Sequence, residues 1–392
     1  MAYVPGDYAK VLAFLALLII QTGVALLFKM SQRNGKYNFS PGSAQTTAEV
    51  CKFWISAVLF RQEILQPVRI PLSNSRDEES GFSVPPSLLE ALQRQVDKRL
   101  LSHTGGLALL YCFNNQLAFA LFRWADAASV TLVKSASSVV SAILLWLLLS
   151  RPITSLQWTA ILLQVLGLWI VQYDSCKHAI LLEPLVYVAL FVSLGISSGA
   201  GVWNEHVLKT SRVSMHAHNC CLYAFGIALN LTVFCFLEER PTYLPLASAY
   251  FRGYNAAAVG VIFCQAVLGL VVTAVLKYAD MVIRCLASAC SVSALYAVNV
   301  LFLGWTVNWT YCAGCAVVFL STYLYMSLGA NAVLERTVVP SCADKPPVAN
   351  AVGSTLANSW VTLPYLHWAA WCVAVFSTAG LLSYLASSPE TV

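Results

Sequence analysis

Ten long apolar stretches dominate the chain and restrict what it can fold into. Each is long enough to cross a hydrocarbon layer of about 30 Å as an α-helix, which rises about 1.5 Å per residue. Five stretches lie before residue 180 and five after it, so each half carries an odd number of crossings. Two such halves lie in opposite orientations across a membrane. The stretches are 8–28, 43–60, 102–122, 127–149, 155–173, 182–207, 215–237, 254–276, 281–303 and 308–327.

Composition agrees with a membrane protein. The 392 residues are 58% hydrophobic and only 10% charged, whereas soluble domains carry about 25% charged residues. The predicted fold class is therefore an all-α polytopic membrane protein, and the lipid bilayer is a predicted partner. Net charge is a modest +5 with no arginine-rich run, which argues against a nucleic-acid partner.

An internal repeat supports the division into two halves. The order cation-aromatic-Ala-Asp occurs at 123–126 and again at 277–280, and the serine-rich segment 135–139 resembles 288–292. A repeat of this length, with five crossings per copy, predicts two inverted five-helix repeats. The predicted units are 1–173, 174–327 and a C-terminal extension 328–392, in which 364–386 is a candidate eleventh helix that would place the C-terminus in the lumen.

The largest hydrophilic segment is 61–101, between the second and third stretches. Residues 73–86 are rich in Ser, Pro and acidic side chains and are predicted to be disordered. Ser87 and Glu90 then form a capping-box pattern. An amphipathic helix over 87–101, lying on the membrane surface, is expected. Its apolar face comprises Leu88, Leu92 and Val96.

The distribution of Lys and Arg sets the orientation. With a cytosolic N-terminus, fourteen cations face the cytosol and seven face the other side, which agrees with the positive-inside rule. The 61–101 segment is then a cytosolic loop. Glycosylation sequons beginning at Asn38 and Asn308 would face the lumen.

Catalytic and metal-binding patterns are not apparent. Most of the thirteen cysteines fall inside apolar runs, where core or lipid-facing thiols are expected instead of metal ligands or disulfides. The sequence shows no Ser/His/Asp order, HExxH or Gly-rich phosphate loop. Neither an enzymatic function nor a cofactor is expected.

Ionisable residues inside the apolar stretches are the first functional candidates, because charge is costly in a bilayer. Lys134 lies eight residues into the fourth stretch, about 12 Å deep, and serines flank it. It either faces a polar cavity or pairs with a distant Glu for packing. Glu49 and Lys52 are spaced i,i+3 and can pair on one helical face, as a packing element or as part of a gate.

Amides and aromatic side chains are the second set of candidates. Tyr111, Asn114, Asn115 and Gln116 are consecutive or nearly so in the third stretch, where unsatisfied polar groups are expensive. They line a cavity or bond neighbouring helices. In the seventh stretch His218 and Asn219 precede Tyr223 by about one turn, and His218 alone is expected to be a packing group.

These side chains together favour one kind of solute. Lys and Arg can hold phosphate, and amides with Tyr can recognise a base edge and ribose hydroxyls. Intramembrane Asp and Glu relays for proton or sodium coupling are scarce, with Glu49 the exception. An anionic solute that contains a ring suits this inventory.

At these residues the sequence resembles the Golgi nucleotide-sugar transporters, in the group that handles CMP-sialic acid, UDP-galactose and UDP-N-acetylglucosamine. The group belongs to the drug/metabolite transporter superfamily. The resemblance covers about 20–327 and rests on five motifs in order. They are 49–52, Tyr111–Phe119, 126–128, 201–209 with Asn219 and Tyr223, and 277–280.

The resemblance implies ten helices and exchange of a cytosolic pyrimidine nucleotide sugar for a lumenal nucleoside monophosphate, in the Golgi or ER membrane. A homodimer or a glycosyltransferase complex stays open. The roles that it implies are nucleotide contacts for Tyr111, Asn115, Asn219 and Tyr223, a phosphate contact for Lys277, and the substrate path for Glu49 and Lys52.

Two positions depart from the family pattern. Ser137 stands where the family usually has Lys, and Lys134 lies about one turn earlier, where it either substitutes for that Lys or marks an altered substrate. Arg284 replaces a usual Lys and keeps the charge. Loss of exchange in Lys134→Ala is expected if that residue holds phosphate. Two rival functions are another metabolite exporter of the same superfamily and a non-transporting scaffold of the glycosylation machinery.

Overall fold

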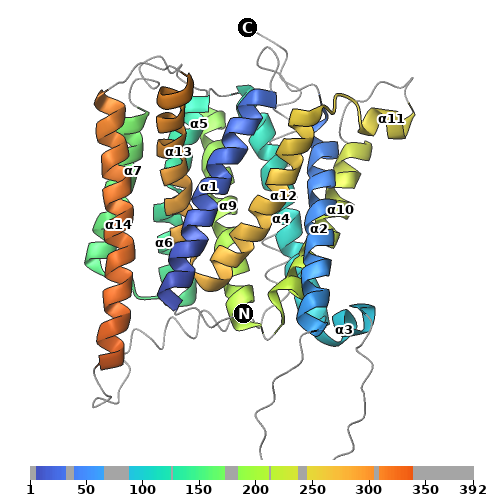
Figure 1. Cartoon of the computed structure of the whole chain (residues 1–392), viewed down its shortest axis with the longest axis horizontal. Coiled ribbons are helices and arrows are strands. Elements are labelled where there is room, and N and C mark those ends of the chain that lie inside the picture. The colour runs from blue at the N-terminus through green and yellow to red at the C-terminus, as the bar shows by residue number, and fades with distance from the viewer. Residues whose placement is uncertain are drawn as a thin grey trace, which may run out of the picture.

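The computed structural model is helical throughout the part of the chain that it describes, which comprises residues 6–31, 39–65, 88–124, 127–172, 184–211, 213–236, 245–303 and 309–338. The long helices stand side by side (Figure 1). The elements are α1 (Gly6–Ser31), α2 (Pro41–Leu65), α3 (Leu88–Gln95), α4 (Lys98–Trp124), α5 (Ala127–Ser135), α6 (Ser137–Leu149), α7 (Ser155–Val171), α9 (Pro184–Thr210), α10 (Met215–Phe236), α11 (Leu246–Tyr250), α12 (Ala256–Tyr278), α13 (Met281–Leu303) and α14 (Trp309–Val338).

The bundle has two edges and a centre. Helices α7 and α14 pack together at one edge and α2 and α10 at the other, with α1, α4, α9, α12 and α13 between them (Figure 1). The connections from α6 to α7, from α9 to α10 and from α12 to α13 meet at the lower end of Figure 1, where α3 also lies. Segments far apart in sequence are therefore neighbours at this end.

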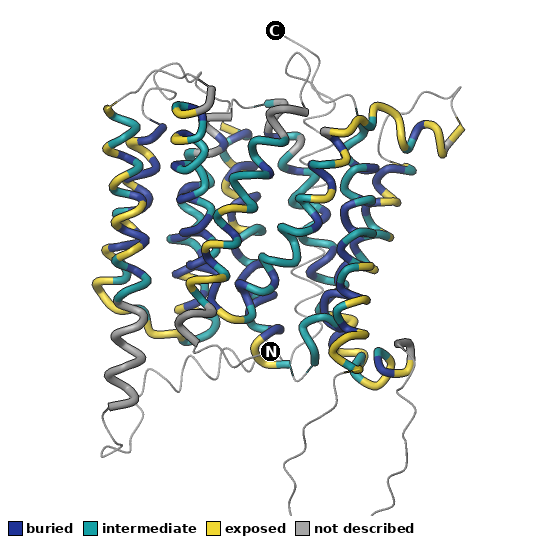
Figure 2. The backbone as a smooth tube through the Cα atoms, in the orientation of Figure 1, coloured by how far each residue is buried: buried dark blue, intermediate teal, exposed yellow. Residues whose placement is uncertain are grey.

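The outward faces of the bundle are apolar. Leu301 is 76% exposed and Ile19 69%, and exposed stripes follow the outer helices in Figure 2. The interior, by contrast, buries Ser43, Ser193 and Asn230. Small and polar residues inside with large apolar residues outside are what a bilayer requires, because lipid does not penalise exposed hydrocarbon.

Seven segments of the described residues are long and apolar enough to span a membrane. They lie in α1, across α5 and α6, and in α9, α10, α12, α13 and α14. Helices α2 and α4 carry charged and amide side chains that lower their hydropathy, and α7 has only 17 residues. The chain is a multi-pass membrane protein.

Helix boundaries fall within a few residues of those expected at most ends, because local capping signals set them. Thr154 and Gln157 form a capping box that starts α7, and the Asn255 side chain accepts a hydrogen bond from the Ala258 N–H at the start of α12. The last helix is the exception, since α14 continues to Val338, beyond the predicted unit boundary at 327.

The amphipathic helix expected over 87–101 is shorter in the structure. It ends at Gln95, and Asp97 Oδ1 accepts a hydrogen bond from the Leu100 N–H at 2.7 Å, which begins α4 as a new helix. Ala91 and Leu92 pack with Phe60 of α2 and with the start of α10. The apolar face of α3 therefore contacts the bundle, and its position on the membrane surface stays a prediction.

The fourth predicted span is broken at Ala136. Ser135 Oγ donates to the Leu132 carbonyl at 2.6 Å and accepts from Trp169 Nε1 at 3.1 Å. A serine that bonds its own helix in this way competes with the backbone ladder. Lys134 and Ser137 lie on opposite sides of the break, so their expected common helical face is not continuous.

Some expectations fall outside the described residues. They are the candidate helix 364–386, the disordered segment 73–86, the Ser87 cap, and the sequons at Asn38 and Asn308. Ten cysteines lie in the described ranges and all are free thiols. Cys312 and Cys315, which have CxxC spacing, are among them, and no metal-binding group of His, Cys, Asp or Glu occurs in these ranges.

Candidate functional site

A polar chain links three helices in the interior. Asn204 of α9 donates from Nδ2 to the Tyr111 hydroxyl of α4 at 3.2 Å, and its Oδ1 lies 3.0 Å from Nε2 of His218 on α10. Because Oδ1 can only accept, the His218 proton is on Nε2. Asn204 and His218 are 2% and 0% exposed. This chain fixes the phenol of Tyr111, which also donates to the Ala200 carbonyl at 3.5 Å.

Asn219 follows His218 and differs from it in its bonding. It is completely buried, and neither Oδ1 nor Nδ2 has a hydrogen-bond partner among the described residues. A buried amide without partners costs free energy, so its presence calls for a reason such as ligand binding. Asn230, on the same helix, is satisfied, because its Nδ2 donates to the Gly226 carbonyl at 2.8 Å.

Tyr223 lies one turn after Asn219 on α10, as the spacing predicts. Its hydroxyl is 3.3 Å from Thr273 Oγ1 of α12, and Lys52 Nζ lies 5.5 Å from the centroid of its ring. The ring therefore faces the cation of α2. This contact connects the seventh predicted span to the Glu49–Lys52 pair.

Glu49 and Lys52 form the ion pair that their spacing predicts. Lys52 Nζ is 2.8 Å from Glu49 Oε1, and both residues are 8% exposed. Two glycines make room for the pair. A Cβ at Gly269 of α12 would lie 2.7 Å from Lys52 Cε, and one at Gly226 of α10 would lie 3.0 Å from Glu49 Oε2. The pair thus packs at the junction of α2, α10 and α12.

Arg284 and Lys277 flank the α12–α13 connection in different environments. Lys277 Nζ donates to the Leu208 carbonyl at 3.0 Å, a cation placed favourably at the C-terminal turn of α9. Arg284 Nη1 contacts Met281 Sδ at 3.3 Å, while its Nε is buried without a hydrogen-bond partner in the described ranges. Within the described ranges, no carboxylate forms an ion pair with Arg284.

The remaining predicted site residues lie on α4 and on the pair α5 and α6. Asn114 accepts from Ser193 Oγ of α9 at 2.9 Å, so it bonds a neighbouring helix. Asn115 is half-buried and makes no side-chain hydrogen bond within the described part. Ser137 is the first residue of α6, and Ser141, one turn later, has its Oγ 3.7 Å from Cys285 Sγ of α13. Lys134 is half-buried near the end of α5.

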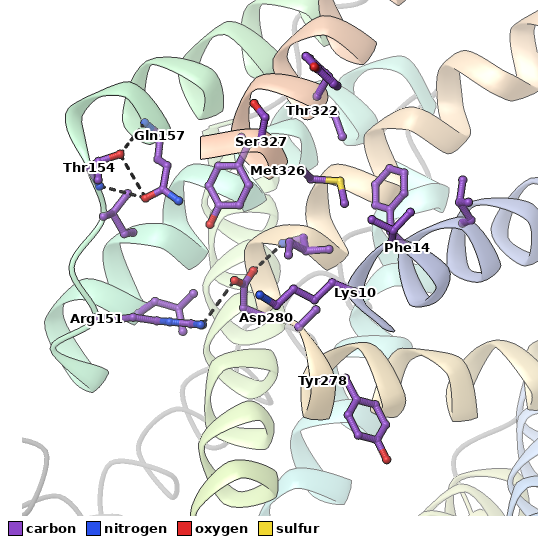
Figure 3. Close-up of a pocket in the computed structure, with 18 of the residues that line it drawn as sticks. Lys10, Phe14, Arg151, Thr154, Gln157, Tyr278, Asp280, Thr322, Met326 and Ser327 are labelled. Carbon is purple, nitrogen blue, oxygen red and sulfur yellow. Dashed lines mark hydrogen bonds and ion pairs between the residues drawn. The ribbon is translucent and has the colours of Figure 1, made fainter. Parts of the chain in front are cut away.

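An ion-pair cluster at the lower end of the bundle was not predicted. Arg151 Nη1 lies 3.1 Å from Glu205 Oε1 and 3.4 Å from Asp280 Oδ2. Lys209 contacts the same Glu205 oxygen at 2.7 Å, and the Met281 N–H donates to Oε2 at 2.7 Å. Figure 3 shows Arg151 and Asp280 meeting across this end. The cluster joins α9, the α6–α7 connection and the α12–α13 connection.

Only part of this cluster has a sequence signal. Glu205 and Lys209 have the i,i+4 spacing of a helical ion pair, and Asp280 precedes a helix as an N-cap, where Oδ1 accepts from the Ile283 N–H at 2.8 Å. Arg151 is 54 and 129 residues away from its two partners. That approach depends on tertiary structure.

Comparisons with known proteins agree on the class of protein. The model of a family described as nucleotide-sugar transporter matches residues 6–326. CMP-sialic acid transporter 2 of Oryza sativa subsp. indica is 26% identical over 324 residues, which is 81% of this chain and 83% of that protein. CMP-sialic acid transporter 4 of Arabidopsis thaliana is 25% identical over 318 residues, 79% and 82% of the two chains.

A solved structure has the same fold. It is described only as a crystal structure of a protein, with a TM-score of 0.58 and 14% sequence identity. The match covers 83% of this chain and 98% of that one. At this identity the likeness concerns the arrangement of helices alone.

Proposed function

Because the chain belongs to the nucleotide-sugar transporter family, we propose that it exchanges a cytosolic pyrimidine nucleotide sugar for a lumenal nucleoside monophosphate. The family transports solutes and is not enzymatic. The observation that carries the proposal is Asn219, a fully buried amide without a partner in the described ranges, next to the chain of His218, Asn204 and Tyr111.

The chemistry of these groups suits a pyrimidine nucleotide. An amide offers one acceptor and two donors, which complement the edge of cytosine or uracil. Tyr111 adds a fixed aromatic ring. The Arg284 guanidinium, without a carboxylate partner in the described part, is available to a phosphate, for which a planar fork is well suited. The names of the plant relatives favour a CMP-linked sugar, and UDP-sugars share the pyrimidine ring.

Lys134, Lys277, Ser137 and Asn115 complete the proposed cavity. Ser141, one turn after Ser137 on α6, contacts Cys285 of α13, which follows Arg284. Lys277 is held at the end of α9 by the Leu208 carbonyl, which uses one of the three N–H donors of its ammonium group. Glu49, Lys52 and Tyr223 then form the opposite wall.

We further propose ten membrane crossings in two inverted five-helix repeats, with α2, α4 and α7 added to the seven apolar segments. The helix contacts favour this arrangement. In two equivalent repeats, a contact between two helices implies a contact between their counterparts. Helix α1 packs on α12, and their counterparts α9 and α4 pack on each other. Helix α2 also packs on α12, and their counterparts α10 and α4 pack on each other. Equivalent helices of the two repeats also pack on each other: α2 on α10, α6 on α13 and α7 on α14.

Alternating access follows as the proposed mechanism. The cluster of Arg151, Glu205 and Asp280 ties both repeats together at the lower end of Figure 1, which the cation count assigns to the cytosol. It must open for entry from that side, by rocking of one repeat against the other. A Golgi or ER membrane is the proposed location.

Ligand-induced stabilisation of the purified full-length protein tests the substrate class. CMP or UMP should raise the unfolding temperature, whereas AMP and GMP should leave it unchanged. Asn219→Leu should remove the shift without destabilising the unliganded protein, because it deletes a buried amide that has no partner in the described ranges. Asn230→Leu is the matched control on α10, and should lower the unliganded unfolding temperature but keep the shift.

The opposite pattern would contradict the proposed site. If Asn219→Leu responds to CMP and UMP as the wild type does, Asn219 does not contact the nucleotide. If purine nucleotides stabilise the wild type equally, the proposed preference for a pyrimidine is wrong.

A further inference from the structure

A groove separates α1 from α14 at the lower end of the bundle, outside the proposed nucleotide cavity. Its cavity volume is about 860 Å³. Helix α1 packs on α12 and α13, and α14 packs on α7 and α13, so α13 forms the back of the groove. Figure 3 shows Phe14 and Met326 on facing sides of it, with Arg151, Lys10 and Asp280 at one end.

The side walls of the groove are mostly apolar and partly open, with hydroxyls of Thr322 and Ser327 on the α14 side. Phe14, Leu15, Phe319 and Met326 line it, and Leu15 and Phe319 are 45% and 44% exposed. Along α14 the lining extends from Phe319 to Ser327, about 12 Å of helix at 1.5 Å per residue. In a membrane protein such a wall faces lipid, and its length matches a segment of an acyl chain.

The end of the groove is polar and cationic. Lys10, Arg151 and Lys209 line it together with Asp280. Asp280 Oδ1 accepts a hydrogen bond from the Ile283 N–H, and Oδ2 pairs with Arg151. Arg151 uses Nη1 for its two carboxylates, so Nε and Nη2 are without protein partners in the described ranges while the side chain remains 46% exposed.

We propose that this groove binds a phospholipid with an anionic headgroup, whose phosphate lies against Arg151 and Lys10 and whose acyl chain lies between α1 and α14. A soluble anion would contact Arg151 and Lys10 but leave the apolar walls uncovered. A zwitterionic lipid would cover the walls but bring its own cation to the same end. An anionic lipid matches both parts, since cations near the membrane surface attract acidic headgroups.

Native mass spectrometry of the full-length protein with added lipid tests the proposal. Phosphatidylinositol should bind at least about tenfold more tightly than phosphatidylcholine. Lys10→Gln should weaken phosphatidylinositol binding about fivefold, the effect of one cation at a membrane surface. Arg94→Gln, a change of an exposed cation on α3 outside the groove, should not weaken it.

A pair of α1 variants tests the apolar part. Leu15→Trp fills the groove and should reduce lipid adducts, whereas Leu12→Trp should not, because Leu12 is 68% exposed and does not line the groove. A benzophenone amino acid at position 15 provides a test that leaves the rest of the chain unchanged. On irradiation it should crosslink to lipid.

Three results would overturn the proposal. Equal binding of the two lipids would remove the role of the cations. Displacement of bound phosphatidylinositol by CMP would assign the groove to the nucleotide path. A crosslink from position 15 to the peptide 364–386 would show that the C-terminal extension occupies the groove instead.

Discussion

Replacing Arg284 by glutamine tests whether a buried cation is kept for the ligand. The guanidinium has no carboxylate partner in the described part of the chain, and its Nε makes no hydrogen bond there. An unpaired cation inside a protein costs free energy. The unliganded Arg284→Gln protein should therefore be as stable as the wild type or more stable.

The effect on binding should be large and in the opposite direction. A hydrogen bond to a charged group contributes about 1.5–3 kcal/mol, which corresponds to a rise in Kd of about 12- to 160-fold. At a ligand concentration of about 100 times the wild-type Kd, the ligand stabilises the wild type by about 2.7 kcal/mol. The same concentration should stabilise Arg284→Gln by only about 0.3–1.3 kcal/mol.

Thermal and chemical unfolding in detergent, with and without CMP or UMP, measures both quantities. Lys52→Gln is the contrasting variant, because it leaves the buried Glu49 without its partner and should destabilise the unliganded protein by about 3–5 kcal/mol. If Arg284→Gln destabilises the unliganded protein as much as Lys52→Gln does, Arg284 is structural. An unchanged ligand effect in Arg284→Gln would also refute the reasoning.

Two further changes test the packing of the bundle. Glu205→Ala should lower the free energy of unfolding by about 3–5 kcal/mol, because it leaves Lys209 and the Met281 N–H without their partner. Arg151→Ala should lower it by about 1 kcal/mol or less, since that side chain is 46% exposed. Equal losses in urea unfolding would contradict the central place of Glu205 in the cluster. Gly269→Ala should cost about 1–3 kcal/mol because its Cβ meets Lys52, while Gly260→Ala on the same helix, with no atom within 4 Å of its Cβ, should be neutral or stabilising. Equal unfolding temperatures for the two alanine variants would show that α12 shifts at Gly269 to make room for the added methyl group.

Features that depend on local sequence were predicted well. Apolar runs give the approximate extent of the long helices, and the Glu49–Lys52 pair follows from i,i+3 spacing. The same-face relation of Asn219 and Tyr223 on α10 is also local. These features need no knowledge of which helices are neighbours.

Features that depend on tertiary contacts could not be predicted. Next to the break at Ala136, the Ser135 hydroxyl accepts a hydrogen bond from Trp169, a contact between α5 and α7. Arg151 reaches Glu205 and Asp280 only after three connections meet at one end of the bundle. Asn204 lies in the 201–209 motif, but its role could not be predicted, because its bonds to Tyr111 and His218 join three separate helices.

Exchange by the purified protein in liposomes tests the central claim most directly. Vesicles are preloaded with CMP-sialic acid, UDP-galactose or UDP-N-acetylglucosamine, or left empty, and uptake of radiolabelled CMP and UMP is followed. The account predicts faster uptake when one of these nucleotide sugars is inside, and loss of that acceleration in Asn219→Leu. Equal uptake by preloaded and empty vesicles, with protein that is folded by its unfolding curve, would contradict exchange and favour a non-transporting membrane scaffold.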